Sequence, residues 1–146
     1  MKMTKYLFVY GTLMSRAKGE LGTDQRRRLA AESHLLGEAR INGRLFNLGN
    51  YPALGLEKTR SPFAYGELLD LHDPTATFAW LDTYEGLDPT NLAQNEYRRV
   101  VHSVELLSSG STKAWVYALN VRVDEQQLIE SGRWLAATCE TTRRNL

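Results

Sequence analysis

The sequence is poor in the features that would cross-link the chain or hold it in a membrane. Cys139 is its one cysteine, so no disulfide can form within the chain, and this favours a reducing compartment. A polar N-terminus precedes only five apolar or aromatic residues, Tyr6–Tyr10, which is too short for the core of a signal peptide. No apolar run approaches the roughly 20 residues that span a membrane. We therefore expect a cytoplasmic protein with no membrane partner.

An excess of charge of either sign is also missing. The formal net charge of +1 gives the protein no general attraction to nucleic acid or anionic lipid. Arg26–Arg28 could contact phosphates, but the nearby Asp24 and Glu32 favour a solvated helix face. We therefore expect no nucleic-acid partner.

Length and composition instead suit one folded domain. The chain has 146 residues, of which 42% are hydrophobic and 24% are charged, an ordinary globular balance. A chain of this length buries about two-thirds of its unfolded surface, enough for one core. No shift in composition marks a boundary, so we expect a single domain over residues 1–146.

Strand patterns outnumber helix patterns along the chain. The expected strands are Tyr6–Tyr10, short strands within Leu35–Leu56 that include Arg44–Leu48, Phe63–Leu71, and a hairpin of Tyr97–Leu107 with Thr112–Asn120. The expected helices are Gln25–Glu32 capped by Asp24, one that begins at Asp73-Pro74 and ends at Gly86, and a short one from Asp124 to Ser131-Gly132. Few strands are separated by a crossover helix, which predicts an α+β fold with a curved, mixed or mainly antiparallel sheet.

The first candidate for a binding element is the loop that leaves the first strand. Gly11 lets the backbone turn sharply and lets a ligand approach closely, and Thr12 adds a hydroxyl. Such a turn can direct successive backbone N–H groups at one anionic oxygen. A plain turn would have the same sequence, so both a ligand cradle and a structural turn remain open.

The first candidate for acid–base chemistry is Glu85. It stands in the last turn of its expected helix, where the helix dipole disfavours negative charge and can raise proton affinity. That property suits a group that takes and returns a proton. A solvated surface glutamate is the alternative. Asp82 is either a second acid or a partner for a nearby arginine.

Other catalytic signatures are missing. The three histidines are scattered without a second ligand at metal spacing, so we expect no metal site. The sequence has no nucleophile elbow, phosphate-binding loop or dinucleotide fingerprint. We interpret Cys139 as a thiol without a catalytic role.

Six short segments, in order, resemble the γ-glutamylcyclotransferase-like family, in particular its AIG2-like branch with the γ-glutamylamine cyclotransferases. The similarity covers residues 6–134. The matching segments are Val9–Leu13, Leu48–Leu54, Gly66–Leu68, Leu81–Gly86, Tyr97–Arg99 and Ser131–Trp134. No single segment is specific, but their order is.

The resemblance implies a small β-barrel with flanking short helices and a core over about 6–134. It implies Glu85 as the catalytic general acid and base. The implied substrate-binding residues are Tyr10, Gly11, Thr12, Leu13, Tyr51, Tyr97 and Arg99.

The implied reaction converts the γ-glutamyl group of a γ-glutamyl amine or peptide into 5-oxoproline and releases the amine. It needs no cofactor and no metal. Two segments depart from the family pattern, Met14–Gly19 and the long polar stretch Leu87–Glu96, and both could reshape the mouth of the pocket. The alternative is a non-catalytic protein that binds a small metabolite in the same pocket.

Overall fold

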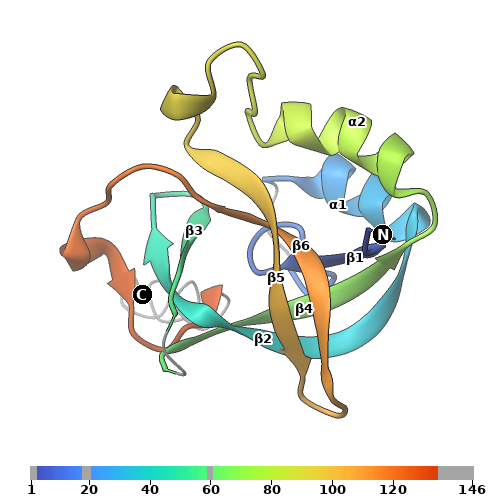
Figure 1. The fold of residues 1–146 in the computed structure, drawn as a ribbon, viewed down its shortest axis with the longest axis horizontal. Helices are drawn as coiled ribbons and strands as arrows, with labels where there is room; N and C mark the ends of the chain where they lie inside the picture. Colours follow the sequence, from blue (N-terminus) through green and yellow to red (C-terminus); the bar gives the residue numbers. More distant parts are fainter. Residues whose placement is uncertain (1–2, 18–20, 59–60, 135–146) are drawn as a thin grey trace, which may run out of the picture.

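Five strands close into a ring at the centre of the molecule (Figure 1). In the computed structural model, which describes residues 3–17, 21–58 and 61–134, the ring follows the order β1 (Tyr6–Val9), β4 (Phe63–Leu71), β2 (Ser33–Asn47), β5 (Tyr97–Leu106) and β6 (Ser111–Leu119). The β1–β6 pair closes the ring with parallel strands, with Leu7 opposite Trp115, and the other pairs are antiparallel. The small mixed β-barrel of the expected α+β class is confirmed.

Two more strands and two helices complete the fold. Strands β3 (Pro52–Leu56) and β7 (Leu128–Ile129) pair with β2. Helices α1 (Thr23–Ala31) and α2 (Pro74–Tyr84) lie side by side (Figure 1). Glu32, which follows α1, accepts hydrogen bonds from the Thr77 hydroxyl (2.7 Å) and the Trp80 indole (3.0 Å) of α2. Two 3₁₀ turns, Leu92–Gln94 (η1) and Glu125–Gln127 (η2), lie in the connections.

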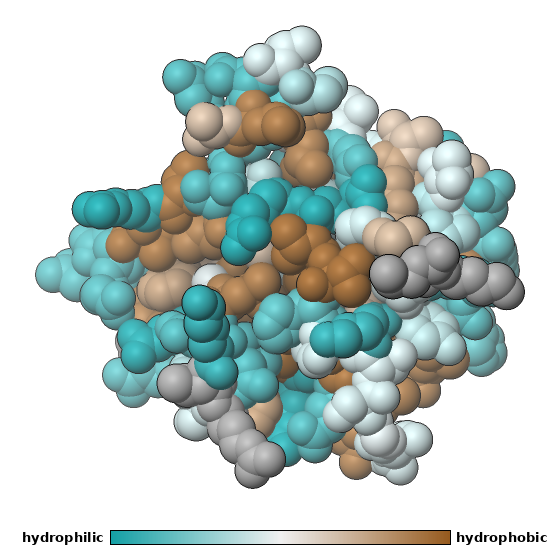
Figure 2. All heavy atoms as spheres, in the orientation of Figure 1, coloured by the Kyte–Doolittle hydropathy of each residue, from teal (hydrophilic) through white to brown (hydrophobic). Residues whose placement is uncertain are grey.

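The inward faces of the strands form one apolar core. Leu7, Leu45, Leu68 and Val116 have no exposed surface, and removing apolar surface from water is the main force that holds such a barrel together. On the outside, Figure 2 shows apolar side chains in a band across the middle of one face, with hydrophilic ones around it. No helix in the described ranges is long and apolar enough to cross a membrane.

Several local expectations are confirmed. Strand β4 has the predicted bounds Phe63–Leu71, and β5 and β6 form the predicted hairpin. Asp73 caps α2 by accepting the N–H of Ala76 (3.2 Å). Gly86 follows the helix at φ 79°, a conformation that favours glycine and stops the helix there.

The segment Leu35–Leu56 was expected to contain short strands; its end does form one, β3, but its first part does not. Residues 33–47 form one long strand, because Gly37 (φ 145°) sits at a bulge opposite β4 that bends the strand without ending it. Gly43 continues the strand where a Cβ would lie 2.7 Å from the carbonyl oxygen of Gly55.

Two helix predictions also need correction. Helix α1 begins after Gly22, and Asp24 lies inside its first turn instead of capping it. Asp124 does cap, through a capping box, but the segment that follows is only the 3₁₀ turn η2. Cys139 lies outside the described residues.

Candidate active site

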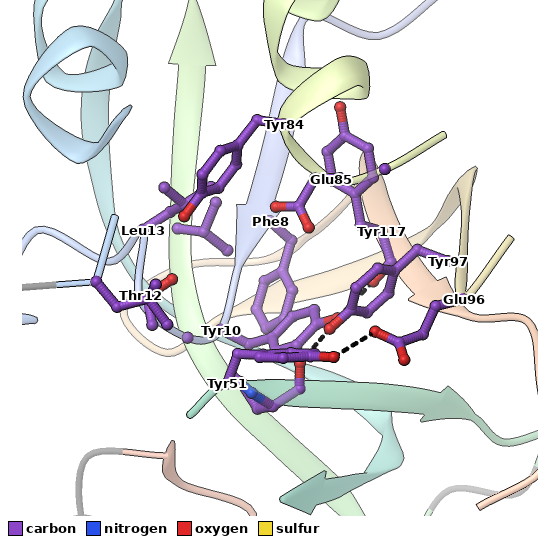
Figure 3. Close-up of a pocket in the computed structure, with 15 residues that line it drawn as sticks. Phe8, Tyr10, Thr12, Leu13, Tyr51, Tyr84, Glu85, Glu96, Tyr97 and Tyr117 are labelled. Carbon is purple, nitrogen blue, oxygen red and sulfur yellow. Dashed lines mark hydrogen bonds between the residues drawn. The ribbon is translucent and has the colours of Figure 1, made fainter. Parts of the chain in front are cut away.

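A cavity of about 340 Å³ opens where the end of β1 approaches the end of α2 (Figure 3). Cavities of roughly this size hold small molecules. Seven of the eight expected site residues line it: Tyr10, Gly11, Thr12, Leu13, Tyr51, Glu85 and Tyr97. The fold therefore brings expected residues from segments far apart in the chain to one cavity.

The loop after β1 is fixed from two sides. Ser15 donates its backbone N–H (2.5 Å) and its hydroxyl (2.7 Å) to the carboxylate of Glu67, which is 3% exposed. From α1, Arg26 donates to the carbonyl oxygen of Thr12 (2.8 Å). Within the described chain, the N–H groups of Thr12 and Leu13 donate no hydrogen bond, so they are available to an anionic oxygen.

Gly11 is required by a close contact and not by an unusual backbone angle. Its φ is not positive. A Cβ at Gly11 would lie 2.5 Å from Cγ and 2.7 Å from Cδ of Pro52, at the start of β3. The missing side chain therefore lets the loop and β3 approach each other along one wall of the cavity.

Glu85 is placed by the end of α2. Its N–H donates to the carbonyl oxygen of Leu81 (2.9 Å), so the backbone still follows the helix. Figure 3 shows the carboxyl group directed into the cavity, with Thr12 and Leu13 across from it. The side chain is partly buried and accepts no hydrogen bond from the described residues.

The surroundings of Glu85 favour its protonated form. Burial, together with the negative charges of Asp82 and Glu96, raises the pKa of Glu85 from 4.5 to about 7. The sequence had suggested a high proton affinity from the helix dipole, and the cause found in the structure is mainly desolvation. A carboxyl group that titrates near neutral pH can accept and donate a proton with similar ease.

Tyrosine rings form much of the cavity wall, with their hydroxyl groups bound elsewhere. Tyr10 donates to the carbonyl oxygen of Tyr117 (2.5 Å) and Tyr97 to that of Pro52 (2.7 Å). Tyr117 donates to Asp82 (2.6 Å). Burial raises the pKa of each of these three phenols well above the usual value for tyrosine, so the three hydroxyl groups stay neutral. They contribute ring surface and a fixed shape to the cavity.

Arg99 is the expected site residue that does not line the cavity. Its guanidinium binds both carboxylate oxygens of Asp82 (2.8 and 3.2 Å) and lies over the rings of Phe78 and Trp115. Direct binding of substrate by Arg99 therefore finds no support in this arrangement. Asp82 is the arginine partner that we considered as the alternative to a second acid.

The lining residues that sequence reasoning did not expect include three with polar side chains, namely Tyr84, Glu96 and Tyr117. Glu96 ends the polar segment Leu87–Glu96, and it accepts a hydrogen bond from the Tyr51 hydroxyl (2.8 Å). The sequence marked that segment as unusual but gave no sign of which residue faces inward. Tyr84 lies in the segment Leu81–Gly86 that carries the family resemblance, next to Glu85, whereas Tyr117 had only its aromatic side chain as a signal.

No group of three or more histidine, cysteine or acidic side chains is placed to hold a metal ion in residues 3–17, 21–58 and 61–134. The cavity offers two carboxyl groups, tyrosine rings and loop N–H groups. With these the site can bind a small polar molecule at both an anionic and a cationic group, and it can move one proton.

The fold and this cavity describe a small α+β barrel with a pocket beside its first strand. Residues 7–136 match the family described as "Gamma-glutamyl cyclotransferase, AIG2-like", which covers most of the chain. The chain therefore belongs to the AIG2-like γ-glutamyl cyclotransferase family. No curated protein sequence gives a significant match.

Solved structures show the same fold. YkqA from Bacillus subtilis is similar with a TM-score of 0.70 and 25% identity, over 97% of this chain and 43% of YkqA, so this chain spans less than half of that protein. An AIG2-like protein from Mus musculus has a TM-score of 0.63 and 20% identity, over 85% of this chain and 82% of its own. A protein from Pyrococcus horikoshii has a TM-score of 0.63 and 19% identity, over 96% and 98% of the two chains.

Proposed function

We propose that this protein cyclises the γ-glutamyl group of a γ-glutamyl amine or peptide to 5-oxoproline and releases the amine, with Glu85 as general acid and base. The observation that carries the proposal is the Glu85 carboxyl group, which is directed into the cavity and accepts no hydrogen bond from the described residues. Family membership supports the reaction type.

A γ-glutamyl compound contains its own nucleophile, so the protein needs to supply only position and proton transfer. The α-amine of the substrate attacks the γ-carbonyl carbon, a C–N bond closes the lactam ring, and the amide C–N bond to the leaving amine breaks. Holding the chain folded in the cavity gains rate through proximity. The N–H groups of Thr12 and Leu13 are suited to bind the substrate carboxylate or to stabilise charge on the carbonyl oxygen.

Glu85 is suited to carry protons from the attacking nitrogen to the leaving nitrogen. Its carboxylate takes a proton from the α-ammonium, which makes the amine nucleophilic, and gives it to the departing nitrogen. Attack leaves a second surplus proton on the ring nitrogen; the regenerated carboxylate takes this proton as the lactam forms and passes it to the released amine, which leaves as an ammonium ion. A pKa of about 7 keeps both forms populated near neutral pH. The hydroxyl groups of Tyr10 and Tyr97 are engaged with backbone carbonyls and do not compete for this proton.

The experiment is a screen of γ-glutamyl amines and γ-glutamyl peptides with detection of 5-oxoproline. We expect release of 5-oxoproline from at least one compound by the wild-type protein and unchanged activity in the presence of a strong chelator. Binding of these compounds without any 5-oxoproline would instead identify a metabolite-binding protein that uses the same cavity.

A further inference from the structure

We propose that Glu96 selects substrates whose leaving amine carries a second positive charge, such as the γ-glutamyl derivative of a diamine. This inference rests on the proposed function, which it narrows to a class of leaving group. It starts from Glu96, a second carboxylate in the cavity that the cyclisation itself does not need.

Glu96 is held in place by its backbone as well as by its side chain. Its carbonyl oxygen accepts the N–H of Asn120 (2.8 Å), and the preceding Asn95 is 8% exposed and hydrogen-bonded to Asp88 from both ends of its amide. The hydroxyl of Tyr51 donates to one carboxylate oxygen of Glu96 (2.8 Å). The other oxygen accepts no hydrogen bond from the described residues, so it can take a donor from a ligand.

The walls of the cavity favour a positively charged group independently of the carboxylates. The hydroxyl groups of Tyr10, Tyr97 and Tyr117 are bound to partners in the protein, and that of Tyr51 is bound to Glu96, so these four residues offer the ligand ring surface instead of donors. Aromatic ring faces attract ammonium groups. None of the described lining residues is an arginine or a lysine that would neutralise the carboxylates.

The positions of Glu85 and Glu96 in the cavity suit them to different roles. In Figure 3, Thr12 and Leu13 lie on one side of the cavity, Glu96 lies on the other, and Glu85 lies between them. A glutamyl carboxylate bound at the loop N–H groups and a γ-amide beside Glu85 leave the Glu96 side for the leaving amine. A second ammonium there would bind Glu96, whereas a leaving group with a carboxylate would be repelled.

The test compares three substrates of similar length: the γ-glutamyl derivatives of diaminobutane, pentylamine and aminobutyrate, with cationic, neutral and anionic leaving groups. The readout is the ratio of kcat/KM for the cationic substrate to that for the neutral one. We expect wild type to prefer the cationic substrate and Glu96→Gln to lower the ratio by roughly 5- to 30-fold. A ratio is used because Glu96 also raises the pKa of Glu85, and that effect acts on both substrates.

Two variants act as controls. Glu130→Gln removes the same charge from an exposed position away from this cavity and should leave the ratio unchanged. Tyr51→Phe keeps the charge of Glu96 and removes the hydroxyl that orients it, so it should lower the ratio by a smaller factor. If Glu96→Gln does not fold, as judged by thermal unfolding, Tyr51→Phe alone decides the question.

Calorimetric binding of free diaminobutane and of butylamine separates this inference from the proposed function. Turnover with a ratio that Glu96→Gln leaves unchanged would overturn the inference and keep the cyclisation. An equal loss for all three substrates would also overturn it, because Glu96 would then act on the part that all three share, through the glutamyl group or through the pKa of Glu85. Binding of diaminobutane that depends on Glu96, without turnover of any substrate, would support the cation preference and overturn the cyclisation. The absence of both turnover and diaminobutane binding would overturn the inference and the cyclisation together.

Discussion

Glu67 and Glu85 both lie beside the cavity loop, and their carboxylates have opposite surroundings. Glu67, on β4, accepts two hydrogen bonds from Ser15 and forms an ion pair with Arg16 (3.5 Å). Glu85, at the end of α2, has the charges of Asp82 and Glu96 nearby and accepts no hydrogen bond from the described residues. A buried carboxylate whose oxygens accept hydrogen bonds holds neighbouring structure in place, whereas the desolvated carboxylate of Glu85, which accepts none from the described residues, is kept ready to bind a proton. The comparison predicts that Glu67 serves the shape of the site and Glu85 its chemistry.

The largest expected effect comes from Glu85→Gln. The amide keeps the size of the side chain but cannot accept a proton, so turnover should fall by about 10²–10⁴-fold, the usual contribution of a general acid–base group. The variant should remain folded and should bind ligand with an affinity near that of wild type. Steady-state kinetics with 5-oxoproline detection checks the change, and a variant as active as wild type would show that Glu85 is only a lining residue.

The second-largest expected effect is that of Gly11→Val on ligand binding. The affinity should fall on the order of 10²-fold, because the new side chain forces the loop away from Pro52. Affinity for a γ-glutamyl ligand, measured by calorimetry together with thermal unfolding, is the readout. Gly110→Val is the matched control, since a Cβ there meets nothing within 4 Å. A folded Gly11→Val variant with unchanged affinity would remove the loop from the binding site.

Glu67→Gln should act on stability. The amide can still accept from Ser15 but loses its charge, so the free energy of unfolding should fall by roughly 1–3 kcal/mol. Ser15→Ala should not add its full effect to that of Glu67→Gln, because both changes break one network. Denaturant unfolding of the two single variants and the double variant measures this. Full additivity would mean that the two residues act independently.

The dependence of stability on pH should report the raised pKa of Glu85. Because the pKa of Glu85 is about 7 when folded against 4.5 unfolded, the folded state binds more protons between these values. The stability from this group is present below the unfolded pKa and is lost as the pH rises through about 7. Glu85→Gln should therefore gain roughly 1–3 kcal/mol relative to wild type between about pH 5 and about pH 8. A parallel pair of stability curves would contradict this.

Asp82→Asn should have the smallest effect on turnover, less than about tenfold, because Asp82 pairs with Arg99 and moves no proton. It should also lower the pKa of Glu85 by removing a nearby negative charge. Kinetics across pH would show both effects. A loss as large as that of Glu85→Gln would mean that the two acids share the proton.

Local signals explain how much of the fold could be predicted. Asp73-Pro74 and Gly86 mark the ends of α2 because capping and glycine conformation depend on neighbouring residues alone. The long strand β2 was missed because Gly37 and Gly43 resemble breaks in sequence, and only pairing with β4 and β3 keeps the strand continuous.

In the candidate site, too, features set by neighbouring residues could be predicted and features set by distant contacts could not. The loop at Gly11 and the end of α2 at Glu85 have sequence signatures, and the structure brings them to one cavity. The inward position of Glu96 depends on hydrogen bonds from Asn120 and Tyr51, far away in the chain. Arg99 was expected in the cavity, but Asp82 and two aromatic rings hold it outside.

The most direct test of the central claim is single-turnover formation of 5-oxoproline across pH, with wild type and Glu85→Gln. If Glu85 is the proton carrier, the wild-type rate should rise with pH through an apparent pKa near 7, as the carboxyl group loses its proton, and the rise should be absent in Glu85→Gln. A rise that persists unchanged in Glu85→Gln would contradict the account, because another group would then be moving the proton.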